Sequence, residues 1–136
     1  MRSTEQPTNR GEPMKQRGYT LIELLVTMVI IALLLTLAAP RYFGQVDKAK
    51  EDVLREDLYL MRDAIDKYFM DRGRYPDQLE DLVTHKYLRA IPVEPYTGSR
   101  TTWVIEETTD GTPGNVFNVR TPTRGKGRDG SDMQEW

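Results

Sequence analysis

The sequence has no cysteine and only one histidine, and both absences limit the chemistry that the chain can carry out. Without cysteine the chain can form no disulfide, although an oxidising compartment outside the cytoplasm would permit one. A catalytic or metal-binding role for His85 would need further histidines or cysteines beside it, so we expect this side chain at the surface. The sequence offers no Ser/His/Asp set, and Gly125-Lys126-Gly127 lacks the Ser or Thr of a phosphate-binding loop. We therefore predict that the protein is not an enzyme.

Charge is nearly balanced over the chain but almost missing from one stretch of it. The 19 Lys and Arg residues against 21 Asp and Glu give a net charge of −2, which does not suggest a nucleic-acid partner. The stretch from Leu21 to Ala39 contains a single charged residue, Glu23. At about 1.5 Å per residue, a helix of this length covers roughly the 30 Å of a hydrocarbon core. The sequence therefore predicts a membrane-spanning helix.

The residues around this apolar stretch indicate a signal that is cut in front of it. Lys15 and Arg17 provide a basic region like that of a secretory leader, yet no small-residue cleavage site follows the stretch. Ala38-Ala39-Pro40 comes nearest to such a site and fits poorly. An unpaired charge near the centre of a bilayer costs roughly 2.5 to 3.5 kcal/mol, so Glu23 should lie near an interface or meet a positive partner.

The residues from Arg17 to Val26, Arg-Gly-Tyr-Thr-Leu-Ile-Glu-Leu-Leu-Val, resemble the class III signal of type IV pilins and type II secretion pseudopilins. The resemblance implies that a membrane-embedded prepilin peptidase cuts between Gly18 and Tyr19 and then methylates the new amino group of Tyr19. The first mature residue of that family is usually Phe, and Tyr19 keeps its aromatic character. Pro40 also matches the family, whose members commonly carry a proline just past the apolar half of a long helix.

Within this motif we expect Thr20 and Glu23 to serve subunit assembly and register. Cleavage would leave Tyr19 with an amine that is mostly cationic at neutral pH, and Glu23 of a neighbouring subunit can neutralise it. Removing one member of such a buried pair typically costs about 3 to 5 kcal/mol, so Glu23 would select the axial register of a filament. Pro40 removes a helical hydrogen-bond donor and is expected to kink or loosen the helix.

The motif divides the chain into three predicted segments. Residues 1–18 form a leader, residues 19–39 a transmembrane and filament-core helix, and residues 40–136 a periplasmic pseudopilin domain. Met14 to Gly18 alone would make an ordinary short basic leader, so composition favours Met14 over Met1 as the translation start. Basic residues flank the apolar stretch on both sides, so the cleavage motif rather than the charge sets the orientation. We expect a single pass through the inner membrane, with the N-terminus cytoplasmic and the C-terminal domain periplasmic.

Beyond Pro40 the apolar residues recur every three or four positions, which is typical of an amphipathic helix. They are Val46, Ala49, Val53, Leu54, Leu58, Met61, Ala64, Ile65, Tyr68 and Phe69. One helix is therefore predicted from Tyr19 to about Asp71, with Gly73 ending it. Oppositely charged pairs at four-residue spacing would add a few tenths of a kcal/mol each: Glu51 with Arg55, and Asp63 with Lys67.

The remaining chain predicts a short helix followed by a β-hairpin. Pro76 suits the first position of a helix whose apolar face would consist of Leu79, Leu82, Val83, Tyr87 and Leu88. Residues 101–107 and 116–120 are rich in β-branched and aromatic side chains and flank a turn-prone segment, so an antiparallel hairpin is predicted. From this hairpin, the side chains expected against the long helix are Trp103 or Val104, Ile105, Phe117 and Val119.

The predicted fold class is α+β. A long N-terminal helix, with a transmembrane half and an amphipathic half, packs on a small C-terminal antiparallel β-sheet, and a short second helix lies between them in the sequence. The aromatic residues Tyr68, Phe69 and Tyr75 are expected to pack in the core rather than to bind a ligand.

The second half of the chain resembles the G-type pseudopilins, the major subunit of the type II secretion filament. The residues that carry this resemblance are Arg74, Tyr75, Pro76, Leu79, Leu82, Tyr87, Leu88, Ile91, Pro92 and Pro95. G-type pseudopilins hold a calcium ion in their C-terminal loop. The resemblance implies that Asp129, Asp132 and Glu135 could supply oxygen ligands for such an ion.

A tail without a cofactor is the alternative to this calcium site. Arg124, Lys126 and Arg128 place positive charge beside the acidic residues, which should weaken the binding of a dication. In this alternative the tail is solvated, and Trp136 is placed on the sheet.

The resemblance predicts a structural subunit that polymerises through its N-terminal helix into the periplasmic pseudopilus of a type II secretion system and drives export of folded proteins. The implied partners are further copies of the chain, the prepilin peptidase, minor pseudopilins, and an inner-membrane assembly platform with its ATPase. A type IV pilus subunit, major or minor, is the alternative. A membrane-anchored enzyme or sensor would explain the apolar stretch but not the position of Glu23 relative to Gly18.

Overall fold

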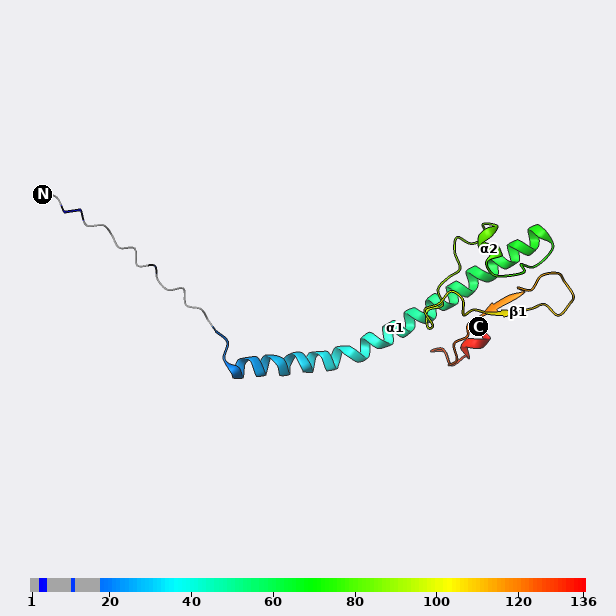
Figure 1. The fold of residues 1–136 in the computed structure, drawn as a ribbon. Coiled ribbons are helices and arrows are strands. Elements are labelled where there is room, and N and C mark those ends of the chain that lie inside the picture. The colour runs from blue at the N-terminus through cyan, green and yellow to red at the C-terminus, as the bar shows by residue number, and fades with distance from the viewer. Residues whose placement is uncertain (1–2, 5–10, 12–17) are drawn as a thin grey trace. The chain divides into compact units, whose positions relative to one another are not determined.

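A computed structural model describes residues 3–4, 11 and 18–136 of the chain. Its elements, in chain order, are α1 (Leu21–Arg72), α2 (Asp81–Thr84), β1 (Val104–Glu106), β2 (Asn118–Arg120) and the 3-10 turn η1 (Met133–Glu135) (Figure 1). The chain divides into two compact units, Met1–Ala39 and Pro40–Trp136. A long helix, a short helix and a two-stranded antiparallel sheet confirm the predicted α+β class.

In the first unit α1 is an apolar helix with exposed side chains. Every large hydrophobic residue from Leu21 to Leu37 is exposed, with fractions between 45% at Ile31 and 78% at Leu21. By length and composition, α1 is the one helix among the described residues that could cross a membrane. The helix begins at Leu21, slightly later than predicted, because Thr20 serves as its N-cap.

The part of α1 that follows Pro40 has one buried face. Its buried residues recur every three or four positions: Glu51, Leu54, Leu58, Met61, Ala64, Ile65 and Tyr68. The predicted amphipathic face is thus confirmed from Leu54 onward, although Val53 is 47% exposed. The helix ends at Arg72, since Gly73 adopts a φ of 67° and donates its N–H to the Phe69 carbonyl at 2.8 Å.

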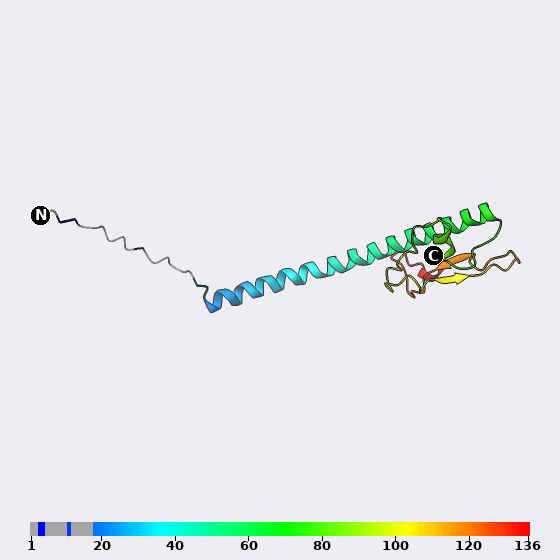
Figure 2. The ribbon, with the colours of Figure 1, turned by 45° about the horizontal axis from the view of Figure 1, so that its top comes forward.

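The core of the second unit lies between this helical face and side chains from the loops and the sheet. The buried residues outside α1 in this core are Leu79, Leu82, Ile91, Trp103, Val116 and Val119. Both α2 and the hairpin lie alongside the last turns of α1 (Figures 1 and 2). Tyr68 is in the core as predicted, and Phe69 stacks on Tyr75 with ring centroids 4.5 Å apart. A sheet of two short strands has too little surface to form this core alone, so α1 supplies its apolar wall.

The second helix is shorter than predicted. It contains only Asp81–Thr84 and does not start at Pro76. Pro76 is buried, and its carbonyl accepts hydrogen bonds from the N–H groups of Asn115 and Val116 at 3.0 and 2.9 Å. This residue therefore pairs with the hairpin segment instead of opening a helical turn. Lys86 has a φ of 66°, a left-handed conformation that stops the helix before Tyr87.

The hairpin is confirmed, but its strands are also shorter than predicted. They pair antiparallel in the register Val104↔Arg120, Ile105↔Val119 and Glu106↔Asn118. Flanking residues have other partners, because Thr102 Oγ1 lies 2.8 Å from Thr97 Oγ1 and Val116 is bonded to Pro76. The Pro76 bond occupies the Val116 N–H, so this group is unavailable for strand pairing.

The predicted packing of the hairpin on α1 is right for two residues and wrong for two others. Trp103 and Val119 are buried, with exposed fractions of 7% and 0%. Ile105 and Phe117 remain 37% and 46% exposed. Contact with α1 is made by β2, where the Val119 carbonyl accepts a hydrogen bond from an α1 arginine, so Ile105 on β1 lies farther out. Phe117 packs instead on the edge of the Tyr75 ring, with centroids 5.3 Å apart.

Candidate functional site

The N-terminal motif forms the first turn of α1. The Glu23 N–H donates to Thr20 Oγ1 at 3.2 Å, and the Leu24 N–H donates to the Thr20 carbonyl at 3.1 Å. Thr20 therefore caps the helix, in the Thr-x-x-Glu arrangement of a capping box. This capping role was not part of the sequence prediction, although the spacing of Thr20 and Glu23 is the signal that could have revealed it.

The predicted cleavage bond between Gly18 and Tyr19 lies just outside the helix. Neither residue is part of α1, and the Tyr19 side chain is 84% exposed. An extended, exposed backbone is what a peptidase needs in order to bind a scissile bond, because helical N–H and carbonyl groups are already bonded. The predicted start at Met14 lies outside the described residues, as does most of the predicted leader 1–18.

Glu23 lies in the first turn of α1 and is exposed. The unpaired N–H groups at a helix N-terminus carry partial positive charge, which favours a carboxylate at this position. Apart from Thr27 and Thr36, the side chains of residues 24–39 are apolar, and they are exposed around the helix. A helix that is apolar on all sides requires an apolar environment, either lipid or other helices.

Pro40 lies inside α1, and the helix continues through it. Its ring leaves the Thr36 carbonyl without the usual N–H donor four residues later. The Thr36 hydroxyl bonds the Ala32 carbonyl at 2.8 Å, one turn earlier in the same stretch. The expected kink or loosening at Pro40 stays a prediction.

The second unit contains a connection between α1 and the loop of residues 124–136. We call it the clasp, and it consists of three α1 side chains, Glu51, Arg55 and Arg62, with the loop residues that they contact. Glu51 is buried and accepts a hydrogen bond from the Arg128 N–H at 2.6 Å. The Arg128 side chain approaches the same carboxylate, with Nε 3.7 Å from Glu51 Oε2.

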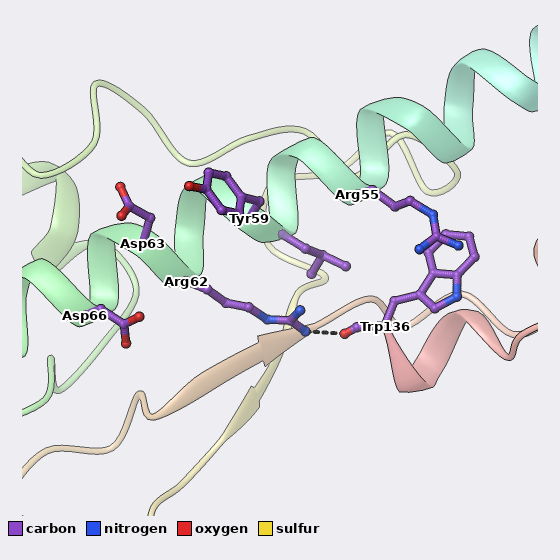
Figure 3. A pocket seen from close by; sticks show the side chains of 7 residues that line it. Arg55, Tyr59, Arg62, Asp63, Asp66 and Trp136 are labelled. Carbon is purple, nitrogen blue, oxygen red and sulfur yellow. Dashed lines mark hydrogen bonds between the residues drawn. The ribbon is translucent and has the colours of Figure 1, made fainter.

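Both arginines of the clasp contact Trp136 at the end of the loop, and Arg55 also contacts Asp129 in its middle. Arg55 pairs with Asp129 at 3.0 Å and places its guanidinium 3.7 Å from the centre of the Trp136 ring. Arg62 donates to Asn118 Oδ1 at 2.8 Å, and its Nη2 donates to the backbone oxygen of Trp136 (Figure 3). Trp136 is therefore packed on α1, and its predicted placement on the sheet stays a prediction.

The predicted intrahelical pairs have different outcomes. Asp63 and Lys67 form their ion pair at 2.7 Å, as expected. Glu51 and Arg55 each pair with the loop instead of with one another.

An open pocket of about 490 Å³ borders the clasp, and in Figure 3 Arg55 and Trp136 lie at one end of it. Its lining residues are Arg55, Leu58, Tyr59, Arg62, Asp63, Asp66 and Trp136.

The residues that the resemblance assigned to calcium lie in this loop and have partners of their own. Asp129 Oδ1 accepts from the Ser131 N–H at 2.9 Å and from its hydroxyl at 2.5 Å. These bonds, with the nearby Arg55 guanidinium, hold the pKa of the Asp129 carboxyl below its usual range. Asp132 caps η1 by accepting from the Gln134 N–H at 3.1 Å, and Glu135 is exposed.

A second buried carboxylate, Glu94, was not identified from the sequence. Its Oε1 accepts from the hydroxyls of Thr121 and Thr123 at 3.0 and 3.1 Å. Its Oε2 accepts from the N–H groups of Tyr96 and Thr97 at 3.0 and 2.5 Å. Burial raises the pKa of Glu94, but these hydrogen bonds outweigh that effect and lower it below its ordinary value. Glu94 thus joins the loop around residue 96 to the strand end at residue 121.

His85 is exposed, as predicted, and its ring lies against Tyr68 with centroids 5.6 Å apart.

Among residues 18–136 and the few described before them, no group of three or more His, Cys, Asp or Glu side chains is placed to hold a metal ion. Calcium binding therefore stays a prediction of the resemblance, and the partners of Asp129 and Asp132 argue against it.

Comparison with known proteins gives two kinds of match. A model of the prokaryotic N-terminal methylation motif matches residues 13–39. The chain is also similar to proteins named type II secretion system core protein G. That of Klebsiella michiganensis is 32% identical over 99 residues, which cover 61% of this chain and 70% of the relative.

Two further relatives with the same name show similar values. The protein of Escherichia coli strain K12 is 32% identical over 98 residues, covering 60% of this chain and 68% of the relative. That of Pseudomonas aeruginosa is 33% identical over 98 residues, covering 60% and 69%. The share of such relatives that is matched ranges from 53% to 70%. No solved structure gives a significant match to this chain.

Proposed function

The chain belongs to the family of type II secretion system core protein G, the G-type pseudopilins, and on this premise we propose that it is a structural subunit of a type II secretion pseudopilus. The proposal rests on one combination: the methylation motif at residues 13–39 in a chain that is about one-third identical to core protein G. The relatives favour this filament over a type IV pilus, and they favour a structural role over an enzymatic one.

The first step of the proposed pathway is processing. A prepilin peptidase cuts between Gly18 and Tyr19, and the new amino group of Tyr19 is methylated. The exposure of Tyr19 and the start of α1 at Leu21 support this step, because the bond to be cut is free of helical hydrogen bonds. Thr20 keeps α1 capped after the cut, since both of its bonding groups lie on the mature side.

The second step is assembly, in which α1 leaves the lipid and packs among the same helices of other copies. Its exposed apolar surface suits both environments, so no large apolar area has to enter water during the transfer. Glu23 then meets the cationic amine of Tyr19 on a neighbouring subunit. Because each charge is unfavourable alone in an apolar core, only the register that joins them is stable.

The membrane topology follows from the same motif. α1 anchors the protein in the inner membrane, and the proposal places the leader in the cytoplasm and residues 40–136 in the periplasm. The leader is residues 1–18, or a shorter one that starts at Met14. In the filament, residues 19–39 form the core, and Pro40 lets the helix adjust to its neighbours.

Several partners are implied by this pathway. The chain polymerises with copies of itself, and the peptidase, minor pseudopilins and an assembly platform with its ATPase act on it. Growth of the filament would then push folded proteins across the outer membrane. These partners rest on family membership and not on contacts within this chain.

A deletion strain tests the function directly. We expect loss of secreted enzymes from the medium with surface fibres unaffected, and full recovery with the wild-type gene on a plasmid. N-terminal sequencing of the protein from membranes should return methylated tyrosine followed by Thr-Leu-Ile-Glu. Normal secretion in the deletion strain, or an intact leader on the membrane protein, would contradict the proposal.

A further inference from the structure

The loop of residues 124–136 is where the family resemblance implies a calcium ion. Calcium in proteins takes six to eight oxygen ligands, mostly carboxylates and carbonyls. A loop that binds the ion should therefore present several such oxygens free of other partners.

Two of the three side-chain carboxylates of the loop, Asp129 and Asp132, are engaged by protein groups, whereas Glu135 is exposed. Asp129 has one oxygen bonded to Ser131 and the other paired with Arg55 at 3.0 Å. Asp132 is the N-cap of η1. Glu51, the buried carboxylate nearest to the loop, is bonded to the backbone of Arg128. A dication would have to displace an arginine from Asp129 and an N-cap from η1.

Several backbone carbonyls of the loop are engaged as well. The Gly127 and Ser131 carbonyls accept from the N–H groups of Gly130 and Gly127 at 3.0 and 2.8 Å. The Gly125 carbonyl accepts from the Met133 N–H at 3.0 Å. The loop thus closes on itself through its own hydrogen bonds.

The positive charges around the loop also argue against a bound cation. Arg55 and Arg128 contact the acidic groups of the clasp directly. Arg124 and Lys126 line the pocket that borders Glu51 and the loop. Each arginine supplies the positive charge that a cation would otherwise bring to these carboxylates.

Packing holds the loop in place from the other side. Gly127 is buried under the Trp136 ring, and a Cβ at this position would overlap Trp136 Cζ2 and lie 2.8 Å from Glu51 Oε1. The Trp136 indole N–H donates to the Ser131 hydroxyl at 2.6 Å. One aromatic ring therefore joins the two ends of the loop and rests on Arg55 of α1.

We propose that the loop of residues 124–136 closes on α1 through the clasp alone and requires no divalent cation. In this chain Arg55 and Arg128 take the place that a calcium ion would hold beside the loop carboxylates. The inference concerns stability of the folded chain and does not depend on which filament the chain builds.

The test measures the melting temperature of the full chain in detergent, with the chelator EGTA and with calcium at about 10 mM, above the millimolar range of weak extracellular sites. A site with a Kd near 1 mM would raise the melting temperature by at least about 5 °C at that concentration. We expect the two melting temperatures to agree within about 1 °C. A rise with calcium of about 5 °C or more would overturn the proposal.

Variants that open the clasp test its contribution to stability directly. Arg55→Met should lower the melting temperature by about 2 to 8 °C, equally in EGTA and in calcium. A variant with wild-type stability in EGTA would overturn the proposal too.

Gly127→Ala should also open the clasp, and it leaves every charged residue in place. We expect a lower melting temperature that calcium does not restore, because the added methyl group displaces Trp136. Gly44→Ala is the matched control: a Cβ there has nothing within 4 Å, and a helical Gly→Ala change should leave the melting temperature equal or slightly higher. Recovery of Gly127→Ala by calcium would show that the cation closes the loop. If neither glycine variant affects melting, the clasp does not hold the loop.

Discussion

The guanidinium of Arg55 lies 3.7 Å from the centre of the Trp136 ring, and Nη2 of the same side chain lies 3.0 Å from Asp129 Oδ2. Arg55 therefore stacks and pairs at the same time. A planar guanidinium can do both, whereas an ammonium forms the ion pair without the stacked plane. Because Arg55 is 47% exposed, its ion pair is screened by water, and the stacking should make the larger contribution.

Arg55→Lys should therefore destabilise the chain although it conserves the charge. We expect a loss of about 0.5 to 1 kcal/mol in the free energy of unfolding, measured by urea denaturation with tryptophan fluorescence. Arg74→Lys is the control, because Arg74 pairs with Asp77 at 2.6 Å at a similar exposure of 45%. Equal losses in the two variants would show that stacking on Trp136 contributes nothing.

Glu94 should make the stability of the second unit depend on acid. Its pKa is lower in the folded chain than its ordinary value of 4.5, since the hydrogen bonds from Thr97, Thr121 and Thr123 outweigh burial. The stabilisation is therefore complete above pH 4.5 and is lost as the pH falls through the lower folded pKa. We expect the melting temperature to fall steeply below about pH 4.5, followed by circular dichroism.

The variant Glu94→Gln isolates this contribution. The amide oxygen of the introduced Gln can still accept hydrogen bonds, but its N–H₂ group would face donors that the second carboxylate oxygen accepts from in the wild type. This mismatch should lower the free energy of unfolding by about 1 to 3 kcal/mol at neutral pH. The melting temperature of the variant should also depend less on pH in the acid range than that of the wild type. Glu107→Gln, at an exposed position directly after β1, should change neither property. An unchanged acid profile in Glu94→Gln would assign the effect to other carboxylates.

Gly114 should tolerate no side chain. It adopts a φ of 105°, and a Cβ there would overlap the Tyr75 carbonyl oxygen. Gly114→Ala is expected to cost about 1 to 3 kcal/mol more than Gly111→Ala, which has a φ of 83° but open space around it. Both variants share the conformational cost, so their difference in urea denaturation measures the overlap alone. Equal costs would mean that the hairpin moves away from Tyr75 freely.

The helical part of this fold could be predicted from the sequence because its signals are local. Residues of the buried face recur every three or four positions, and the helix ends before Gly73, whose positive φ does not continue it. The N-terminal motif was likewise readable, since its residues are contiguous in the chain. The lengths of the strands were less predictable, because Val116 and Thr102 bond to residues outside the hairpin. Strand propensity carries no information about such partners.

The clasp could not be predicted, for a physical reason. Glu51 and Arg55 have the spacing of an intrahelical pair, worth only a few tenths of a kcal/mol. Partners more than seventy positions away displace that pairing, and only the folded chain brings them near. The buried position of Glu94 was missed for the same reason, since its threonine donors follow it by 27 and 29 residues.

Glu23 provides the sharpest test of assembly. In Glu23→Gln the side chain keeps its size, but the amine of Tyr19 on a neighbouring subunit would be left in an apolar core, at a cost of about 3 to 5 kcal/mol per subunit. We expect the variant to be cleaved and retained in the membrane, yet to form no filaments and to abolish secretion. Glu23→Asp should restore part of both activities because it keeps the charge. Thr36→Ala, another exposed polar position on α1, should behave as the wild type. Filaments and secretion at wild-type levels in Glu23→Gln would refute a role for this charge in register.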